Sequence, residues 1–431
     1  MSPYQRCPPD AGVTGVAWQA VPMHATFRSL EHRNARLFFG GMLVSNIGTW
    51  AQFTAVAILV DRLTASTTAI GVLTALQFTP MLLLGAWAGA VSDQVSRWRM
   101  SLITQSGLAL QAVALAALDL AGHATLPVVY ALTLVLGVVS AFDNPARRGF
   151  VTELVPTAQI PNAVSLNTAV MTGSRIFGPA LTALLVNRVG TTWLFAANAV
   201  SFVAILGSLL LLDRTRLHHP PRAPRGGTPI RDGLRAVWDN PVLRSTFIVF
   251  SVLSTFGYNY SVSLPRMSGQ LWGNEQWYGV LLTMASVGSL IGALLTASRA
   301  EVSLRWFALM GVVLGLGGLA LASAPSGWWA MAIAVPMGIG GAGMVSAMNA
   351  IAQQECEPDM RGRILALTAV AFLGSYPIGG PVTGLVGDHI GLRWSLAYGA
   401  LISLAAIAVF TWWAFGQGAG SGRVVTADER R

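Results

Sequence analysis

The stretch VSAFDN at residues 139–144 recurs as VSAMNA at residues 345–350, late in the same chain. A second short match keeps the same order, because GVL at 71–73 recurs at 279–281. Each of these matches lies in or beside a long apolar segment. The pattern therefore indicates two related halves, each made largely of apolar segments.

The composition indicates that these segments cross a membrane. Hydrophobic residues make up 53% of the 431 residues and charged residues only 10%, whereas a soluble domain is nearer a quarter charged. A helix needs ~20 apolar residues to cross the hydrocarbon core. Lipid favours helices because each helix satisfies its own backbone polar groups, and no barrel-type alternation is present. We expect twelve spans at about 37–62, 68–92, 100–121, 126–146, 162–187, 192–213, 243–264, 277–298, 304–324, 328–353, 363–387 and 394–416.

The predicted fold is an all-α integral membrane protein with twelve transmembrane helices in two pseudo-symmetric six-helix bundles. Two related membrane halves are typical of secondary transporters, whose substrate site lies between the halves near the midplane. Prolines and glycines at 220–227 interrupt the chain between the halves, and a short amphipathic helix is expected over 230–241. The expected units are a terminal segment (1–36), the first bundle (37–214), the linker (215–241), the second bundle (242–416) and a tail (417–431).

The basic residues predict the orientation. All 27 basic residues are arginines, and the expected spans place 22 of them on one side. The other side receives Arg62, Arg188, Arg266 and Arg393. The positive-inside rule then predicts a multi-pass protein of the plasma membrane with both termini in the cytoplasm. The arginines are scattered over many short loops, so the net charge of +9 does not indicate nucleic-acid binding.

Four motifs resemble those of a known family. They are GAVSDQVSRWR at 89–99, FDNPARR at 142–148, RIFGP at 175–179 and RGR at 361–363. The first resembles the loop signature of the major facilitator superfamily. Together they resemble the drug-and-siderophore efflux branch, the group of the enterobactin exporter and the macrolide efflux pumps. This resemblance covers roughly residues 37 to 416 and implies export by proton antiport.

The resemblance also implies a gate at the cytoplasmic ends of the helices. In the implied fold, Asp93 abuts the start of the eleventh helix, where a helix N-terminus stabilises a carboxylate by ~0.3–1 kcal/mol. Arg97 is expected to pair with Asp143, and the cluster would hold the gate shut when the outward-facing state forms. The predicted gate residues are Gly89, Asp93, Arg97, Asp143, Arg361 and Arg363.

Arg175 is the basic residue expected near the membrane centre. It lies 13 residues after Asn162, or ~20 Å along a helix. A central arginine costs about 2.5–3.5 kcal/mol on insertion scales and must face protein or a watery cavity. Two interpretations stay open: contact with an anionic substrate group or control of a nearby carboxylate, and a structural pair within the first half.

The predicted substrate cavity combines aromatic, amide and methionine side chains around this cation. Such a set suits a bulky, partly apolar ligand of anionic or catechol-like character. The candidate residues are Asn46, Trp50, Gln52, Phe53, Gln77, Phe142, Asn167, Arg175, Tyr258, Asn259, Tyr260, Met348 and Tyr376.

A proton-coupling carboxylate is harder to identify, because no Asp or Glu occupies the expected membrane centre. Asp61 and Asp119, near the outer ends of the first and third spans, are the candidates. For Asp61 the alternative is an interfacial pair with Arg62.

The leading functional hypothesis is a secondary active transporter that exports a hydrophobic or amphipathic small molecule, a drug or siderophore. It would work by alternating access with proton antiport. Two alternatives stay open, a lipid or lysophospholipid carrier and a non-transporting membrane scaffold or sensor. The sequence contains no P-loop and no catalytic or metal-binding constellation, so we expect no enzyme activity and no cofactor. The expected partners are the small molecule, protons and the lipid bilayer, with the protein as a monomer.

Overall fold

The computed structural model describes residues 27–218, 229–357 and 360–416, and these residues form helices and no β-strand. Eleven helical segments in these ranges are long and apolar enough to span a membrane. One of them, Thr157–Leu210, is 54 residues long. It contains two of the predicted spans, so the expected twelve-span, all-α fold is confirmed.

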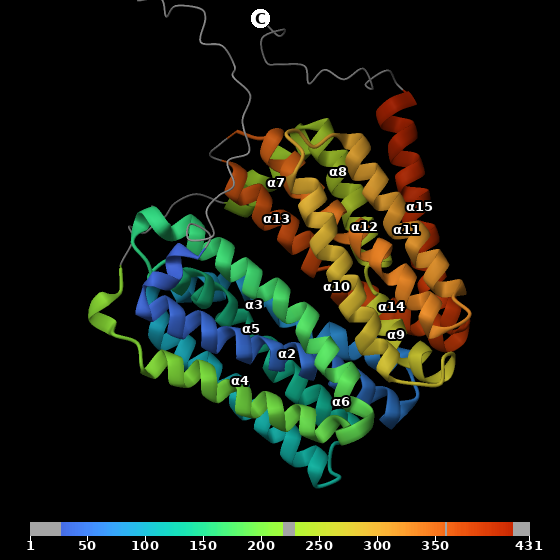
Figure 1. Ribbon diagram of the computed structural model, residues 1–431. Helices are drawn as coiled ribbons and strands as arrows, with labels where there is room; N and C mark the ends of the chain where they lie inside the picture. Colours follow the sequence, from blue (N-terminus) through green and yellow to red (C-terminus); the bar gives the residue numbers. More distant parts are fainter. Residues whose placement is uncertain (1–26, 219–228, 358–359, 417–431) are drawn as a thin grey trace, which may run out of the picture.

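The first half of the chain folds as a helical bundle (Figure 1). Helix α2 packs on α6, and α4 packs on both α5 and α6. Its elements are η1 (Arg28–Glu31), α2 (Arg33–Thr64), α3 (Thr67–Gln94), α4 (Arg97–Leu120), α5 (Leu126–Val151), η2 (Thr157–Gln159) and α6 (Ile160–Leu210).

Helix α6 turns sharply at Gly190, which has φ 77° and ψ −179° inside an otherwise helical run. Only glycine adopts this backbone region readily. Immediately after the turn, Thr191 and Thr192 donate hydroxyl hydrogen bonds to the Asp119 carboxylate at 3.0 and 2.6 Å. These bonds hold the turn against the end of α4. Because the chain reverses at Gly190, α6 supplies two antiparallel spans.

Replacement of Gly190 by alanine is expected to lower the free energy of unfolding by about 1–3 kcal/mol, because a Cβ is strained in this conformation. Thermal unfolding of the detergent-purified protein measures the effect. Gly207→Ala is the matched control, since Gly207 is helical and no atom lies within 4 Å of its added Cβ. That control is expected to be neutral or slightly stabilising. Equal melting temperatures for the Gly190 variant and the parent would contradict the prediction.

The second half forms another bundle, in which α10 and α11 pack on α12, and α11 packs on α15. Its elements are α7 (Pro229–Asp239), α8 (Pro241–Val252), η4 (Leu253–Gly257), α9 (Tyr260–Gln270), α10 (Gln276–Ala297), α11 (Leu304–Ser323), α12 (Gly327–Gln354), α13 (Arg361–Leu373), α14 (Tyr376–His389) and α15 (Leu392–Gly416). The short η3 (Arg214–Arg216) precedes them and packs on the first bundle, where Arg214 lies over the Trp98 ring.

Two spans of the second bundle are broken near their middle, which the apolar pattern does not predict. The first break lies between η4 and α9, where the Asn259 side-chain amide donates to the Thr255 carbonyl at 2.5 Å. The second lies between α13 and α14, where Pro377 occupies the first turn of α14. Proline is tolerated in a first turn but cannot continue a helix. Both breaks place tyrosines at helix starts, Tyr260 and Tyr376.

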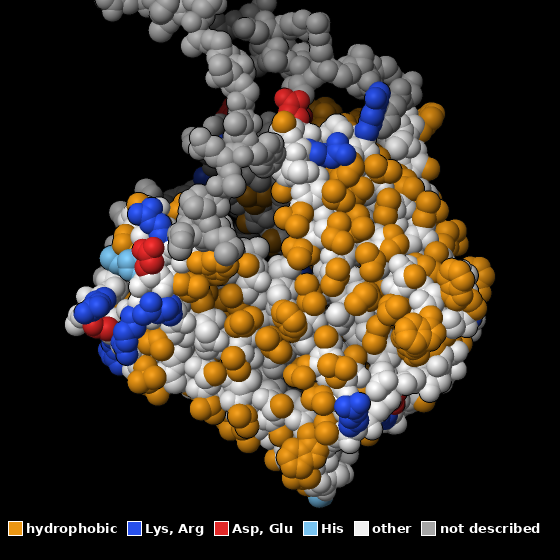
Figure 2. All heavy atoms as spheres, viewed as in Figure 1, with side chains coloured by type: hydrophobic (Ala, Val, Ile, Leu, Met, Phe, Trp, Pro, Cys, Tyr) orange, Lys and Arg blue, Asp and Glu red, His pale blue; other side chains and the backbone are white. Residues whose placement is uncertain are grey.

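The two bundles meet through α3 on α14 and α6 on α10. These two contacts are equivalent under the pseudo-symmetry of the halves. Apolar side chains cover much of the face shown in Figure 2. Leu83 and Trp412 are among the large apolar residues of the chain that are exposed, at 71% and 73%. Such a surface suits lipid as the surrounding medium.

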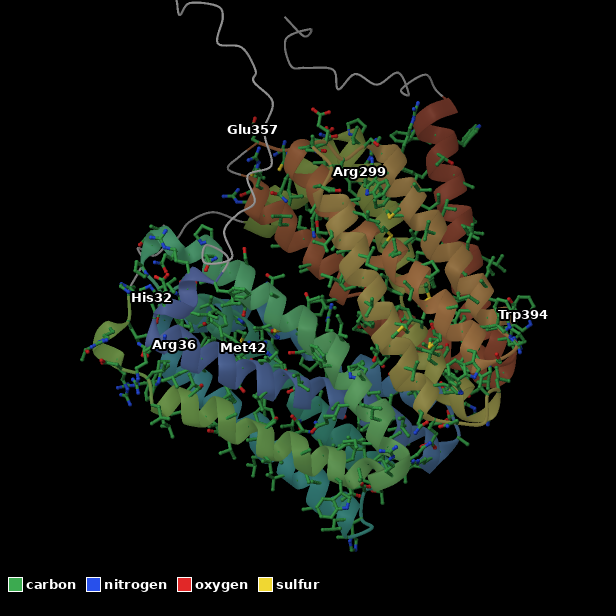
Figure 3. The ribbon with its side chains drawn as sticks, in the orientation of Figure 1. His32, Arg36, Met42, Arg299, Glu357 and Trp394 are labelled. Atoms are coloured by element: carbon green, nitrogen blue, oxygen red, sulfur yellow. The ribbon has the colours of Figure 1, made fainter. Side chains whose placement is uncertain are left out.

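We call the end of the molecule at which α2 begins and α15 ends the termini end. His32, Arg36, Arg299 and Glu357 lie at or near this end, whereas Trp394 lies toward the opposite end (Figure 3). Helix α7 is also at the termini end and packs on α13, with Arg363 donating to Asp232 at 3.2 Å. Leu234 and Trp238 on α7 are more than half exposed.

Candidate substrate site and inter-bundle contacts

Arg175 lies in the middle of the first half of α6. It is 15 residues from both Ile160 and the turn at Gly190, roughly 22 Å from each. Its guanidinium carbon lies 4.9 Å from the ring centroid of Trp50 on α2. Arg175 is exposed, and no carboxylate or other hydrogen-bond acceptor among the described residues contacts it. The alternative of a structural ion pair within the first bundle therefore finds no partner carboxylate in the described chain.

The second bundle presents aromatic rings toward this cation. Tyr258 lies 5.8 Å from Tyr260 and 4.9 Å from Phe372, and Phe372 lies 6.0 Å from Tyr376, all between ring centroids. Tyr376 stacks at 4.7 Å on Phe78 of α3, which belongs to the first bundle. We call these five residues the aromatic cluster.

The charge of Arg175 interacts electrostatically with Tyr258, Tyr260 and Tyr376. The next residue, Ile176, accepts a hydrogen bond from Thr283 of α10 at 3.4 Å, so Arg175 lies on the part of α6 that meets the second bundle. The site so formed offers one cation without a partner carboxylate and several aromatic faces. It can bind the anionic group of a ligand while its rings cover an apolar or planar part.

The predicted cavity residues divide into those that meet at this site and those that lie elsewhere. Trp50, Arg175, Tyr258, Tyr260 and Tyr376 meet here, and Phe53 contacts Trp50 with ring centroids 5.3 Å apart. Phe78 and Phe372 were not predicted. Phe372 is four residues before Tyr376, and the break between α13 and α14 lies between them. Recognition of this break in the sequence would have pointed to Phe372 as a residue of the site.

Other predicted residues lie inside one bundle. Gln52 is buried between α2, α4 and α6, with hydrogen bonds to Gln111 at 3.0 Å and Asn198 at 2.8 Å. Met348 is fully buried in the second bundle. Asn259 is buried and holds the break in its own span through the Thr255 carbonyl.

The remaining four predicted residues lie on the first bundle. Asn46 is buried and bonds to Arg147, with Oδ1 accepting from Nη1 at 3.0 Å. Phe142 contacts Trp87 edge to face at 5.2 Å between centroids. Gln77 and Asn167 are half-buried.

At the opposite end, polar contacts join the two bundles. Asp388 of α14 accepts from the Ser66 hydroxyl at 2.6 Å and from the backbone N–H groups of Thr67 and Thr68 at 2.8 and 3.0 Å. A carboxylate at a helix N-terminus stabilises the unpaired N–H groups and the helix dipole. Arg62 also pairs with Glu275 across the bundles at 2.5 Å.

Small residues bring the backbones of the two bundles together at the same end. A Cβ on Gly71 would overlap the Gly380 backbone, and a Cβ on Gly279 would lie 2.6 Å from the Pro179 carbonyl oxygen. Gly387 lies against Thr67 in the same way, at 3.0 Å between the added Cβ and the Thr67 Cβ. Together with the polar contacts, this packing closes the opposite end.

Two ion pairs at the termini end each lie within one bundle. Arg97 donates to Glu153 at 3.3 Å in the first bundle, and Arg363 donates to Asp232 in the second. Figure 2 shows a hollow between the bundles at this end. The structure is therefore a conformation open at the termini end and closed at the opposite end.

The predicted gate residues whose side chains the structure describes are not gathered into one cluster in this conformation. Arg97 contacts Glu153 and the Gly149 carbonyl, and Asp143 instead bonds to Thr104, Gln105 and Arg147, so the expected Arg97–Asp143 pair is wrong here. The reason is that Asp143 points into its own bundle. Gly89 has open space around its Cβ position, Arg361 is exposed at the start of α13, and the Asp93 side chain lies outside the described part of the structure.

The two predicted proton carriers differ in their surroundings. Asp119 is held by Thr191 and Thr192 at the α6 turn. Asp61 has a buried Oδ1 atom that no described group hydrogen-bonds. Arg62, the expected partner of Asp61, pairs with Glu275 instead.

Comparisons with known proteins agree with this architecture. Residues 24–419 match the model of a family described as transmembrane secretion effector. The chain is 23% identical over 262 residues to the staphyloferrin A transporter of Staphylococcus aureus, covering 60% of this chain and 66% of that protein. It is 26% identical over 328 residues to the multidrug efflux pump Tap of Mycobacterium tuberculosis, covering 72% of this chain and 77% of the pump.

Solved structures share the fold. A mutant of the nucleoside transporter NupG superposes with a TM-score of 0.70 at 16% identity, covering 88% of this chain and 98% of that chain. This likeness concerns the arrangement of the helices.

Proposed function

The chain belongs to the transmembrane secretion effector family of the major facilitator superfamily, and from this membership we propose that it exports an amphipathic drug or siderophore by alternating access. The chain is a multi-pass membrane transporter and not an enzyme. In the proposed cycle, the substrate enters from the cytoplasm and leaves on the outer side of the plasma membrane. Inward movement of protons drives the export.

One observation carries the proposal: Arg175, stacked near Trp50, faces the tyrosines of the aromatic cluster from the other bundle. A site built from both bundles near the midplane is alternately exposed when the bundles rock about it. A scaffold has no need for an arginine without a partner carboxylate at this depth, since such a charge costs several kcal/mol in a membrane.

The arrangement of contacts supports alternating access. Polar bonds and close backbone packing join the bundles at the opposite end, whereas the termini end is open. The arginine distribution supports a cytoplasmic position of the termini end by the positive-inside rule. In this state the site is accessible from the side on which an exported compound is made or accumulates.

Everted membrane vesicles containing the protein and a pH-sensitive dye test the proposal. After energisation, a panel of drugs and siderophores is added, and proton release that depends on both the compound and the protein is expected. Vesicles without the protein are the control. Absence of a response across the panel, with transport of a fluorescent lysophospholipid instead, would replace the proposal by the lipid-carrier alternative.

A further inference from the structure

We propose that the coupling proton of this transporter binds to Oδ2 of Asp143, inside the first bundle, at a small cavity that Asp143 shares with Arg147. This inference rests on the proposed proton antiport and identifies its proton site. Neither Asp61 nor Asp119 takes this role in it. The argument uses the burial of Asp143, its bonds, the cavity and its connection to Arg175.

Asp143 is a carboxylate buried within a membrane-spanning helix. It is 3% exposed and lies eight residues before the end of α5 at Val151, roughly 12 Å along the axis. Ionisable groups buried within a membrane-spanning helix are costly and often belong to proton or substrate pathways. Burial also means that gain or loss of one proton changes the local energy far more than at the surface.

The two carboxylate oxygens of Asp143 differ in their partners. Oδ1 accepts hydrogen bonds from Thr104 Oγ1 and Gln105 Nε2, both at 2.8 Å. Oδ2 faces Arg147 Nε at 3.5 Å, which is longer than a charge-assisted hydrogen bond of about 2.7–2.9 Å. No other described group bonds to Oδ2. Oδ1 is thus fixed in place, and Oδ2 retains lone pairs that can take a proton.

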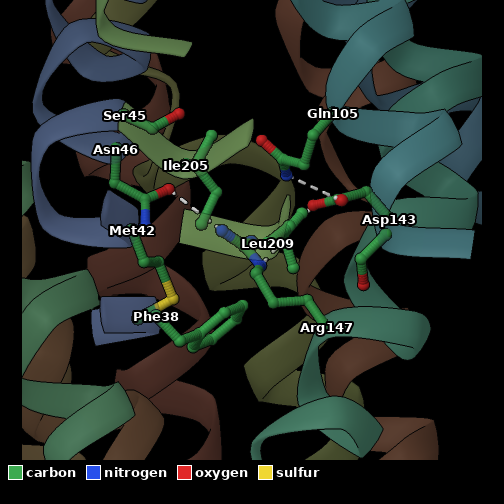
Figure 4. Close-up of a pocket in the computed structure, with 10 residues that line it drawn as sticks. Phe38, Met42, Ser45, Asn46, Gln105, Asp143, Arg147, Ile205 and Leu209 are labelled. Carbon is green, nitrogen blue, oxygen red and sulfur yellow. Dashed lines mark hydrogen bonds and ion pairs between the residues drawn. The ribbon is translucent and has the colours of Figure 1, made fainter. Parts of the chain in front are cut away.

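A cavity with room for about one water molecule lies beside this pair (Figure 4). Gln105 Oε1 and Ser101 Oγ are buried in its wall and have no hydrogen-bond partner among the described residues. Both residues are at least 95% buried. A water in the cavity would satisfy these atoms and can pass a proton to Oδ2, since a buried water normally makes 2–4 hydrogen bonds.

Arg147 is the cationic residue that faces Asp143 in the cavity. The other lining side chains are uncharged: Asn46 from α2, Ser101 and Gln105 from α4, and Ile205 and Leu209 from α6, with Phe38 and Met42. Helix α3 contacts this part of α5 through Trp87 against Phe142 and Met81 against Asn144. Proton binding forms an O–H bond on Oδ2 and changes the charge of the pair from zero to +1, with Arg147 remaining protonated.

The pair is connected to the substrate site by two short steps. Arg147 Nη1 donates to Asn46 Oδ1 at 3.0 Å, and Asn46 Nδ2 lies 3.5 Å from Met171 Sδ. Asn46 lies one helical turn before Trp50 on α2, and Met171 lies one turn before Arg175 on α6. A change in the charge of the pair therefore acts on the two helices that hold Arg175 and Trp50.

Infrared spectroscopy of the purified full chain in lipid nanodiscs tests the proton site without any substrate or gradient. On acidification, the parent protein is expected to show the band of a buried protonated carboxyl group. Asp143→Asn should lose this band and take up one proton fewer, whereas Asp61→Asn and Asp119→Asn should keep it. Asp143→Glu should restore the band at a shifted frequency, which also decides the question if the asparagine variant does not fold.

A band that persists in Asp143→Asn without a shift in Asp143→Glu, or one that disappears in Asp61→Asn instead, would overturn the inference. The same holds if the parent protein shows no such band. Because the assay needs no transported compound, failure of the vesicle assay leaves this result intact. Once a compound has been found, its addition to vesicles should release at least about tenfold fewer protons with Asp143→Asn than with the parent.

Discussion

Replacement of Arg175 by alanine is expected to weaken the binding and export of an anionic compound by about 10- to 150-fold. The substitution removes the only cation that faces the aromatic cluster among the described residues. A hydrogen bond between charged groups contributes about 1.5–3 kcal/mol, and about 1.4 kcal/mol corresponds to a factor of ten. Loss of the stacking with Trp50 adds to the effect.

Initial export rates in vesicles and ligand binding to the purified protein measure this loss. Arg188→Ala is the matched control, because Arg188 is an exposed arginine on the same helix near the opposite end. It should leave both quantities close to those of the parent. Arg175→Lys should recover only part of the binding, since lysine lacks the planar guanidinium. Normal export by the alanine variant would remove Arg175 from the substrate site.

A disulfide between cysteines at positions 67 and 387 is expected to abolish transport almost completely. Thr67 is on α3 and Gly387 on α14, and a Cβ built on Gly387 lies 3.0 Å from the Thr67 Cβ. The small movement needed reaches the usual Cβ separation of about 3.5–4.5 Å in disulfides. The bond would hold the opposite end closed, so the outward-open state required for export could not form.

Thr67→Cys/Gly387→Cys is made in a background in which Cys7 and Cys356 are replaced by serine. Export is measured after oxidation and again after reduction, which should restore it. Gly318→Cys/Ala400→Cys is the matched control, because its Cβ separation is also 3.0 Å but both positions lie in the second bundle, on α11 and α15. That pair should cross-link with little loss of transport. Undiminished export by the fully cross-linked 67–387 pair would contradict movement of the bundles about a central site.

Much of the site could be predicted from the sequence because its residues interrupt an otherwise apolar pattern. Arg175 stands out as a charge within a span, and Trp50, Tyr258, Tyr260 and Tyr376 lie at depths that the span boundaries fix to within a few residues. Gln52 has the same depth and polarity as these residues, yet it faces Gln111 and Asn198 inside the bundle. Depth follows from counting along a helix, whereas the direction of a side chain depends on how that helix is rotated against its neighbours.

The breaks in two spans and the partner of Asp143 also depend on how the helices pack, which the sequence pattern does not specify. An apolar run from 243 to 264 is compatible with one straight helix, and only the structure shows that it breaks between η4 and α9, where it packs against α14 and α15. The sequence motifs predicted Arg97 as the partner of Asp143. In the structure Asp143 contacts Arg147, one turn later on α5, and Thr104 on the neighbouring α4.

The sequence by itself determined that this is a twelve-span helical membrane protein with two related halves, because lipid requires each span to satisfy its own backbone and that requirement is local. The tertiary structure decided which end is closed, which aromatic rings face Arg175 and which carboxylate lies in a cavity beside an arginine. These features depend on distances between helices that are far apart in the chain. Such distances are set by the packing of small residues such as Gly71 against Gly380 and by the few polar bonds at the opposite end.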